Sequence, residues 1–187
     1  MKNYILFIVA ILFMGNAQAQ SEKYGRTLNL GVGIGYYGYL GQTRPVIALN
    51  YEFDVAKNFT LAPFASIFTY RSNYYWGNPN KPNNDPSYRK YSYRATTIPI
   101  GVKATYYFDD ILNANNKWDF YLAGSVGFAY RKVVWENDYS GSRTAYTDAS
   151  PLYLDIHIGT EYHLNKDAGL FLDLSSGVST FGLALHL

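Results

Sequence analysis

The sequence contains no cysteine, which excludes disulfide bonds, thiolate metal sites and the N-terminal lipid anchor of bacterial lipoproteins. Charged residues are also scarce, at 16% of the chain, and the formal net charge is only +2, so no nucleic-acid partner is expected. Beyond residue 19 no run of 18 apolar residues occurs, which excludes a transmembrane helix in that part of the chain. The one GxGxxG match, in residues 33–38, precedes no helix-like pattern, so no cofactor is expected.

Tyrosine and glycine are abundant, with 20 and 16 residues, and apolar residues alternate with small or polar ones over long stretches. Residues 152–164 show the pattern most clearly, with Leu154 and Ile156 on one face and Asp155 and His157 on the other. The stretch is longer than an ordinary strand of about five or six residues. It is typical of a strand that separates two environments, and we interpret it as a transmembrane β-strand.

The N-terminus has the features of a cleaved export signal. Lys2 supplies a positive charge, residues 4–14 are apolar, and residues 17–19 form a small-x-small cleavage site. The apolar run is too short to span a bilayer as a helix, which needs about 20 residues. The sequence therefore predicts a signal peptide over residues 1–19 and one mature domain over residues 20–187.

The alternation predicts an all-β fold, an eight-stranded antiparallel transmembrane β-barrel of the outer membrane. Its segments are 27–37, 45–54, 59–71, 93–108, 118–135, 152–164, 168–175 and 178–187. Residues 72–91 hold three prolines and five asparagines and are predicted to form a long loop, as are residues 136–150. Both long loops fall on one rim and shorter turns on the other, as in outer-membrane barrels, with the long loops external.

This pattern resembles the small outer-membrane barrels of the OmpA and OmpX kind over essentially the whole mature chain. The segment Ile98-Pro99-Ile100 also resembles a strand of the PorT-like barrel families. The resemblance implies an outer-membrane location. One departure is the C-terminal Leu187, since such barrels usually end in an aromatic residue.

Few charges lie on the face opposite the apolar one, which favours a membrane barrel with a narrow lumen over a soluble barrel with a charged exterior. We expect Arg131 to pair with Asp155, and Lys103 to be shared among the remaining acids, because charges in so narrow an interior should be paired. The predicted lumen network comprises Glu52, Lys103, Arg131, Asp155, Glu161 and Asp173.

An aromatic cluster lies in and around the first long loop: Tyr74, Tyr75, Trp76, Tyr88 and Tyr91. It is interpreted either as a contact surface for a sugar or protein or as an aromatic girdle at the lipid interface. No metal site is expected, because His157 and His163 lie about 20 Å apart on one strand. Only His186 is expected to approach His163, near the periplasmic rim.

Three functions fit this interpretation. The favoured one is a structural or surface-interaction barrel with a side-chain-filled lumen. Its partners would be outer-membrane lipid and an extracellular ligand or envelope protein, bound through residues 72–91 and 136–150. The alternatives are a narrow channel or transport component and a lipid-modifying enzyme. No catalytic residue is assigned, because no GxSxG motif is present and no histidine is expected to face the lipid.

Overall fold

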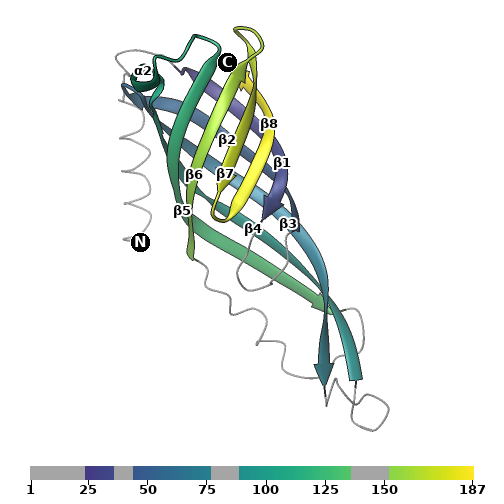
Figure 1. Cartoon of the computed structure of the whole chain (residues 1–187). Helices are drawn as coiled ribbons and strands as arrows, with labels where there is room; N and C mark the ends of the chain where they lie inside the picture. The colour runs from purple at the N-terminus through teal and green to yellow at the C-terminus, as the bar shows by residue number, and fades with distance from the viewer. Residues whose placement is uncertain (1–23, 36–43, 77–88, 136–151) are drawn as a thin grey trace, which may run out of the picture.

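Eight antiparallel strands form a closed barrel in which each strand pairs with its neighbours in sequence and the first pairs with the last (Figure 1). The computed structural model describes residues 24–35, 44–76, 89–135 and 152–187. The strands are β1 (Arg26–Gly35), β2 (Arg44–Ala56), β3 (Phe59–Trp76), β4 (Arg89–Tyr107), β5 (Trp118–Trp135), β6 (Leu152–His163), β7 (Ala168–Ser175) and β8 (Val178–His186). The predicted fold class and strand number are confirmed. One short helix, α2 (Asp109–Leu112), lies between β4 and β5, and no helix within the described residues is long and apolar enough to cross a membrane.

The alternation of the sequence sets which side chains face outward. On β6, Leu154 and Ile156 are 66% and 73% exposed, whereas their neighbours Tyr153 and Asp155 are buried. The outward row of β1 is likewise aliphatic. Because a soluble protein would not leave such a continuous aliphatic belt exposed, this surface fits contact with lipid.

The two ends of the barrel differ. The short-turn rim carries the connection through Lys57 and Asn58, the α2 connection and residues 164–167, together with Arg26 of β1 and His186 of β8. Asn58 has φ 59°, a left-handed conformation that asparagine tolerates in a tight turn. The opposite end, the long-loop rim, is where β3, β4 and β5 end at Trp76, Arg89 and Trp135. The ends of the strands therefore place the long connections on one rim and the short turns on the other, as predicted.

Outward aromatic side chains gather near the short-turn rim. The Trp118 ring stacks on Phe120 with centroids 6.1 Å apart and contacts Tyr162 at 4.8 Å. Phe128 and Tyr130 lie outward further along β5. Aromatic rings of this kind favour the interface between lipid tails and water. The two sets on β5 therefore bracket the aliphatic belt, as the girdles of a membrane barrel do.

Three strands are much longer than a membrane requires. β3, β4 and β5 contain 18, 19 and 18 residues, and about 9–11 tilted residues cross a bilayer. Counted from the short-turn rim, residues 70–76, 89–96 and 129–135 extend past the span, and Figure 1 shows these strands running beyond the rest of the barrel. We call these residues the strand projection.

The projection corrects the loop predicted over residues 72–91. Residues 72–76 and 89–91 are paired strand, with Tyr74 opposite Tyr91 and Tyr75 opposite Lys90. The prediction was wrong at both ends because all three prolines lie within residues 79–86. Residues 77–88, including Tyr88, lie outside the described part of the chain, as do the predicted signal peptide and the loop over residues 136–150.

Candidate functional site

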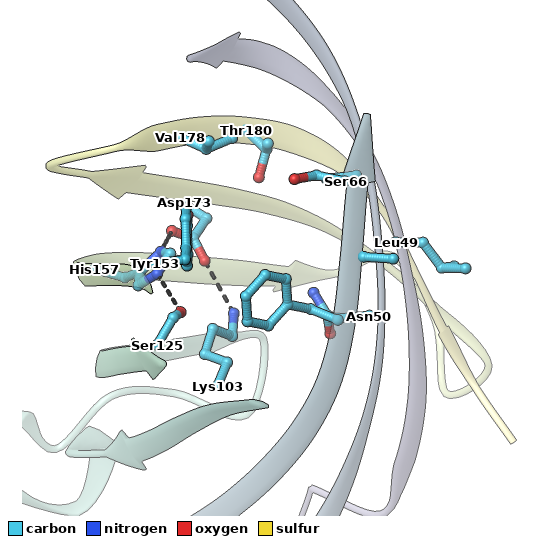
Figure 2. A pocket seen from close by; sticks show the side chains of 13 residues that line it. Leu49, Asn50, Ser66, Lys103, Ser125, Tyr153, His157, Asp173, Val178 and Thr180 are labelled. Atoms are coloured by element: carbon cyan, nitrogen blue, oxygen red, sulfur yellow. Dashed lines mark hydrogen bonds and ion pairs between the residues drawn. The ribbon is translucent and has the colours of Figure 1, made fainter. Parts of the chain in front are cut away.

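The centre of the lumen holds a buried polar network built on Asp173. Lys103 Nζ lies 3.0 Å from Asp173 Oδ2, and both side chains are less than a tenth exposed. The Tyr121 hydroxyl donates to the same oxygen at 3.1 Å. The other oxygen, Oδ1, lies 2.7 Å from His157 Nδ1 (Figure 2). Three partners from β4, β5 and β6 thus satisfy a carboxylate on β7, and the network links strands on opposite sides of the lumen.

Ser125 extends this network, since its Oγ lies 2.7 Å from His157 Nε2. Serine, histidine and Asp173 then stand in the order of a nucleophilic triad, which the sequence did not reveal. The cavity beside them has a volume of about 40 Å³, enough for a few water molecules and far below the roughly 300 Å³ of a small-molecule site. We interpret these contacts as lumen packing.

The predicted pair of Arg131 with Asp155 is wrong. Asp155 accepts hydrogen bonds from the hydroxyls of Tyr153, Ser175 and Ser176, and from backbone N–H groups of the β7–β8 turn. Arg131 instead donates to the Tyr70 hydroxyl and lies over that ring, 5.8 Å from its centroid. Arg131 lies beyond the last β5–β6 pair, so it is too far along the strand to meet Asp155.

Lys103 contacts one acid rather than several as predicted, and Glu52 acts on it only through longer-range electrostatic attraction. Within the described residues, its one carboxylate contact is Asp173. Glu52 is buried and accepts hydrogen bonds from Thr60, from the Tyr107 hydroxyl at 2.7 Å and from Asn29. Glu52 is therefore stabilised by neutral hydrogen-bond donors and not by the predicted contact with Lys103.

Tyrosines close the lumen at the short-turn rim. The Tyr24 ring stacks on Tyr107 with centroids 3.8 Å apart, and Tyr107 contacts Tyr121 edge-on at 5.6 Å. The Tyr24 hydroxyl donates to Asp109 at 2.8 Å. Burial and this hydrogen bond raise the pKa of Tyr24 above its ordinary value, so the hydroxyl remains a donor even in alkaline solution. The lumen is therefore packed with side chains both at its centre and at this end.

The sixth predicted lumen residue, Glu161, lies near the same rim and is buried. It contacts neither Lys103 nor another cationic side chain of lysine or arginine among the described residues. Its Oε1 lies 2.9 Å from His186 Nε2 and 3.8 Å from His163 Nδ1. The structure thus brings together the two histidines whose approach the sequence predicted, with ring centroids 5.1 Å apart.

The predicted aromatic cluster divides between the two faces of the projection. Tyr74 faces inward and meets Trp135 edge-on at 6.2 Å, and Tyr91 is half-buried on the same face. Tyr75 faces outward and is 41% exposed. Trp76 is the last residue of β3. Tyr74 and Tyr91 therefore pack inside the projection, and Tyr75 is exposed on its outer face.

Cations gather on the outer face of the projection. Arg71 lies directly opposite Arg94 in the β3–β4 ladder, and Lys132 of β5 lies opposite Thr96, two residues from Arg94. Lys90 lies opposite Tyr75, and all four cationic side chains are exposed. The projection as defined holds six cations and no acid: Arg71, Arg89, Lys90, Arg94, Arg131 and Lys132.

No known family model matches the sequence, and no curated protein is similar to it in sequence. The solved structures do provide similar folds. Neisserial surface protein A is 12% identical, with a TM-score of 0.51, and the match covers 87% of this chain and 96% of that one. The attachment invasion locus protein Ail of Yersinia pestis, in complex with a heparin analogue, is 10% identical with a TM-score of 0.45, covering 86% and 95%. The fold is thus that of the small eight-stranded outer-membrane β-barrels.

Proposed function

We propose that this protein is a surface-interaction barrel of the outer membrane. Residues 1–19 direct its export and are then removed. Its lumen is closed, and its strand projection stands outside the cell and binds partners that carry negative charge. The observation that carries the proposal is the excess of cations on the projection, six with no acid among its described residues. Clustered positive charge of this kind attracts anionic partners and speeds their association.

The arrangement of the outer face supports an anionic partner. Arg71 and Arg94 are directly opposite each other on the outer face, and Lys132 lies close by on β5. An anionic group bound beside them would meet three exposed cations on one face. Phosphate, sulfate and carboxylate groups all fit, and arginine binds such groups through paired hydrogen bonds. The anion can belong to a lipid headgroup or to an external polymer.

The interior of the projection supports a rigid contact surface. Tyr70 and Tyr93 of the projection form a buried cluster with Phe68 and Val46 of the adjoining barrel, and Tyr74 and Trp135 pack against it. Three strands with a packed apolar side meet the requirement for a sheet that is stable without lipid around it. The outward cations are therefore held on a fixed frame.

The packed lumen disfavours the channel alternative. Tyr24, Tyr107 and Tyr121 occupy the short-turn end, and the Lys103–Asp173 pair crosses the centre. The enzyme alternative would rest on Ser125 and His157, but both are buried beside a cavity far smaller than a lipid chain. Neither alternative accounts for the projection.

Binding of a charged polymer tests the proposal. Purified barrel in neutral detergent should bind dextran sulfate but not neutral dextran. Its affinity for dextran sulfate should fall as the salt concentration is raised. Replacing the four outward cations by glutamine (Arg71, Lys90, Arg94 and Lys132) should weaken binding at least tenfold. Lys57→Gln, at the opposite rim and 79% exposed, is the matched control and should bind as the unchanged protein does.

Vesicles distinguish the two sources of the anion. Preference for phosphate-rich lipid vesicles over dextran sulfate would assign the face to membrane headgroups, and the reverse preference to an external polymer. Equal binding of charged and neutral dextran, or full binding by the fourfold glutamine variant, would contradict the proposed function.

A further inference from the structure

Three side chains at the short-turn rim point their ligand atoms at one another. They are Glu161 and His163 of β6 and His186 of β8. One oxygen or nitrogen of each lies within 4.8 Å of the other two. Imidazole nitrogens and a carboxylate oxygen are the donors that zinc and similar metals take in proteins. We propose that these residues bind one divalent transition-metal ion, with Zn²⁺ as the probe that represents the class.

The separations suit a tetrahedral ion. Glu161 Oε1 lies 2.9 Å from His186 Nε2 and 3.8 Å from His163 Nδ1. Bonds of about 2.0–2.1 Å around zinc place neighbouring ligand atoms about 3.3 Å apart, between these two values. The third separation, between the two histidines, lies within 4.8 Å, so the side chains must draw together for all three atoms to bond one ion.

Two of the three ligand atoms have no hydrogen bond of acceptable geometry among the described residues. They are Glu161 Oε1 and His186 Nε2. Glu161 is only 6% exposed, and its Oε1 lies 2.9 Å from His186 Nε2 outside hydrogen-bond geometry, a costly arrangement for a buried carboxylate. A bound cation would satisfy both at once.

The remaining nitrogens of the two rings are held by other groups. His163 Nε2 lies 2.7 Å from Asp119 Oδ2, and His186 Nδ1 lies 3.1 Å from Thr27 Oγ1. A carboxylate on the far nitrogen of a metal-binding histidine fixes its orientation and raises its basicity. Asp119 is therefore a positioning residue for the His163 ring, and Thr27 fixes the orientation of the His186 ring.

Gly169 makes space for the site. It lies on β7 between the two ligand-bearing strands, opposite His163 and Ala184. A Cβ atom on this glycine would overlap the Glu161 carboxylate. Glycine thus lets Glu161 reach across β7 towards β8. A metal here would connect β6 to β8, beside the seam where β8 pairs with β1 and closes the barrel (Figure 1).

The ion has a route from solvent. The side chains of His163 and His186 are 24% and 19% exposed, and both lie at the short-turn rim. Water from that side therefore reaches the fourth coordination position. The nearby carboxylates of Glu161 and Asp119 favour the entry of a cation.

The test uses full-length mature barrel purified without a histidine tag and stripped with a chelator. We expect one equivalent of Zn²⁺ to bind in titration calorimetry, and Co²⁺ to give the intense visible absorption of a tetrahedral site. His163→Ala, His186→Ala and Glu161→Gln should each weaken binding at least tenfold. Gly169→Ala should also weaken it by displacing Glu161, and Asp119→Asn should do so by about 10–100-fold. Asp110→Asn, an exposed acid at the same rim, is the control and should bind normally.

Zinc should also raise the temperature at which the unchanged barrel loses its heat-modifiable gel migration, because the ion binds only the folded form. If a ligand variant fails to fold, anomalous scattering from crystals of the unchanged protein soaked in Zn²⁺ decides the matter. A peak between Glu161, His163 and His186 supports the site, and its absence overturns it. Undiminished binding by folded ligand variants overturns it as well.

Discussion

Lys103→Met should destabilise the barrel by about 3–5 kcal/mol, because it removes the cation that pairs with a buried carboxylate. Lys103 and Asp173 are 3.0 Å apart, with side chains 7% and 6% exposed. Methionine keeps the length of the side chain and removes its charge. The measurement is urea-induced unfolding in lipid vesicles, followed by gel migration with and without heating. Ion flow through the barrel should change much less than its stability, because tyrosines still fill the lumen.

Two further variants isolate the charge pair. Lys132→Met removes an exposed lysine from the projection and should change stability by less than about 0.5 kcal/mol. The double variant Lys103→Met with Asp173→Asn removes both charges and should recover part of the loss, since no unpaired ion remains. Equal effects of Lys103→Met and Lys132→Met would contradict the buried network.

Ile156→Arg should lower the free energy of unfolding by about 2–4 kcal/mol, the effect of a cation on the lipid face near the bilayer midplane. Ile156 is 73% exposed on the outward face of β6. It lies between Tyr162, which contacts the Trp118 ring, and Leu152, which is opposite Phe128. The cost should appear in the same unfolding measurement in lipid.

The matched control for this variant is Leu170→Arg. Leu170 also faces outward, but it is opposite Tyr162 at the aromatic level near the short-turn rim. An arginine there reaches the interface and should cost about 0–1 kcal/mol. If the two arginine variants lower the free energy of unfolding equally, or neither lowers it, the exposed aliphatic belt is not a lipid-facing surface.

The strands were predictable wherever one face is aliphatic and the other polar, as on β6. On β3 the alternation fails, because large apolar residues lie on both faces. Phe64 and Phe68 point inward and Ile67 points outward. Only pairing with β2 and β4 settles the faces of such a strand. The lengths of β3 and β4 were missed for a similar reason, since polar residues such as Asn73 can continue a strand that pairs above the membrane.

The alternation of residues along each strand predicted that the lumen charges face inward. It did not predict which residues they contact. Asp155 is satisfied by hydroxyl and backbone donors of the β7–β8 turn, which counting formal charges overlooks. His157 shares the parity of Asp155, so its inward position was readable from the sequence. Its contacts with Ser125 and Asp173 depend on the register of three strands, which the sequence alone leaves open.

We propose that the strand projection lies outside the cell while the short-turn rim faces the periplasm. Because the chain has no cysteine, a single introduced cysteine can be labelled without background. Tyr75→Cys reports the exposed outer face of the projection, and Lys57→Cys reports the exposed turn at the opposite rim. A membrane-impermeant maleimide added to intact cells should label Tyr75→Cys, and should label Lys57→Cys only after the outer membrane is permeabilised. Labelling of Lys57→Cys alone in intact cells would contradict this topology.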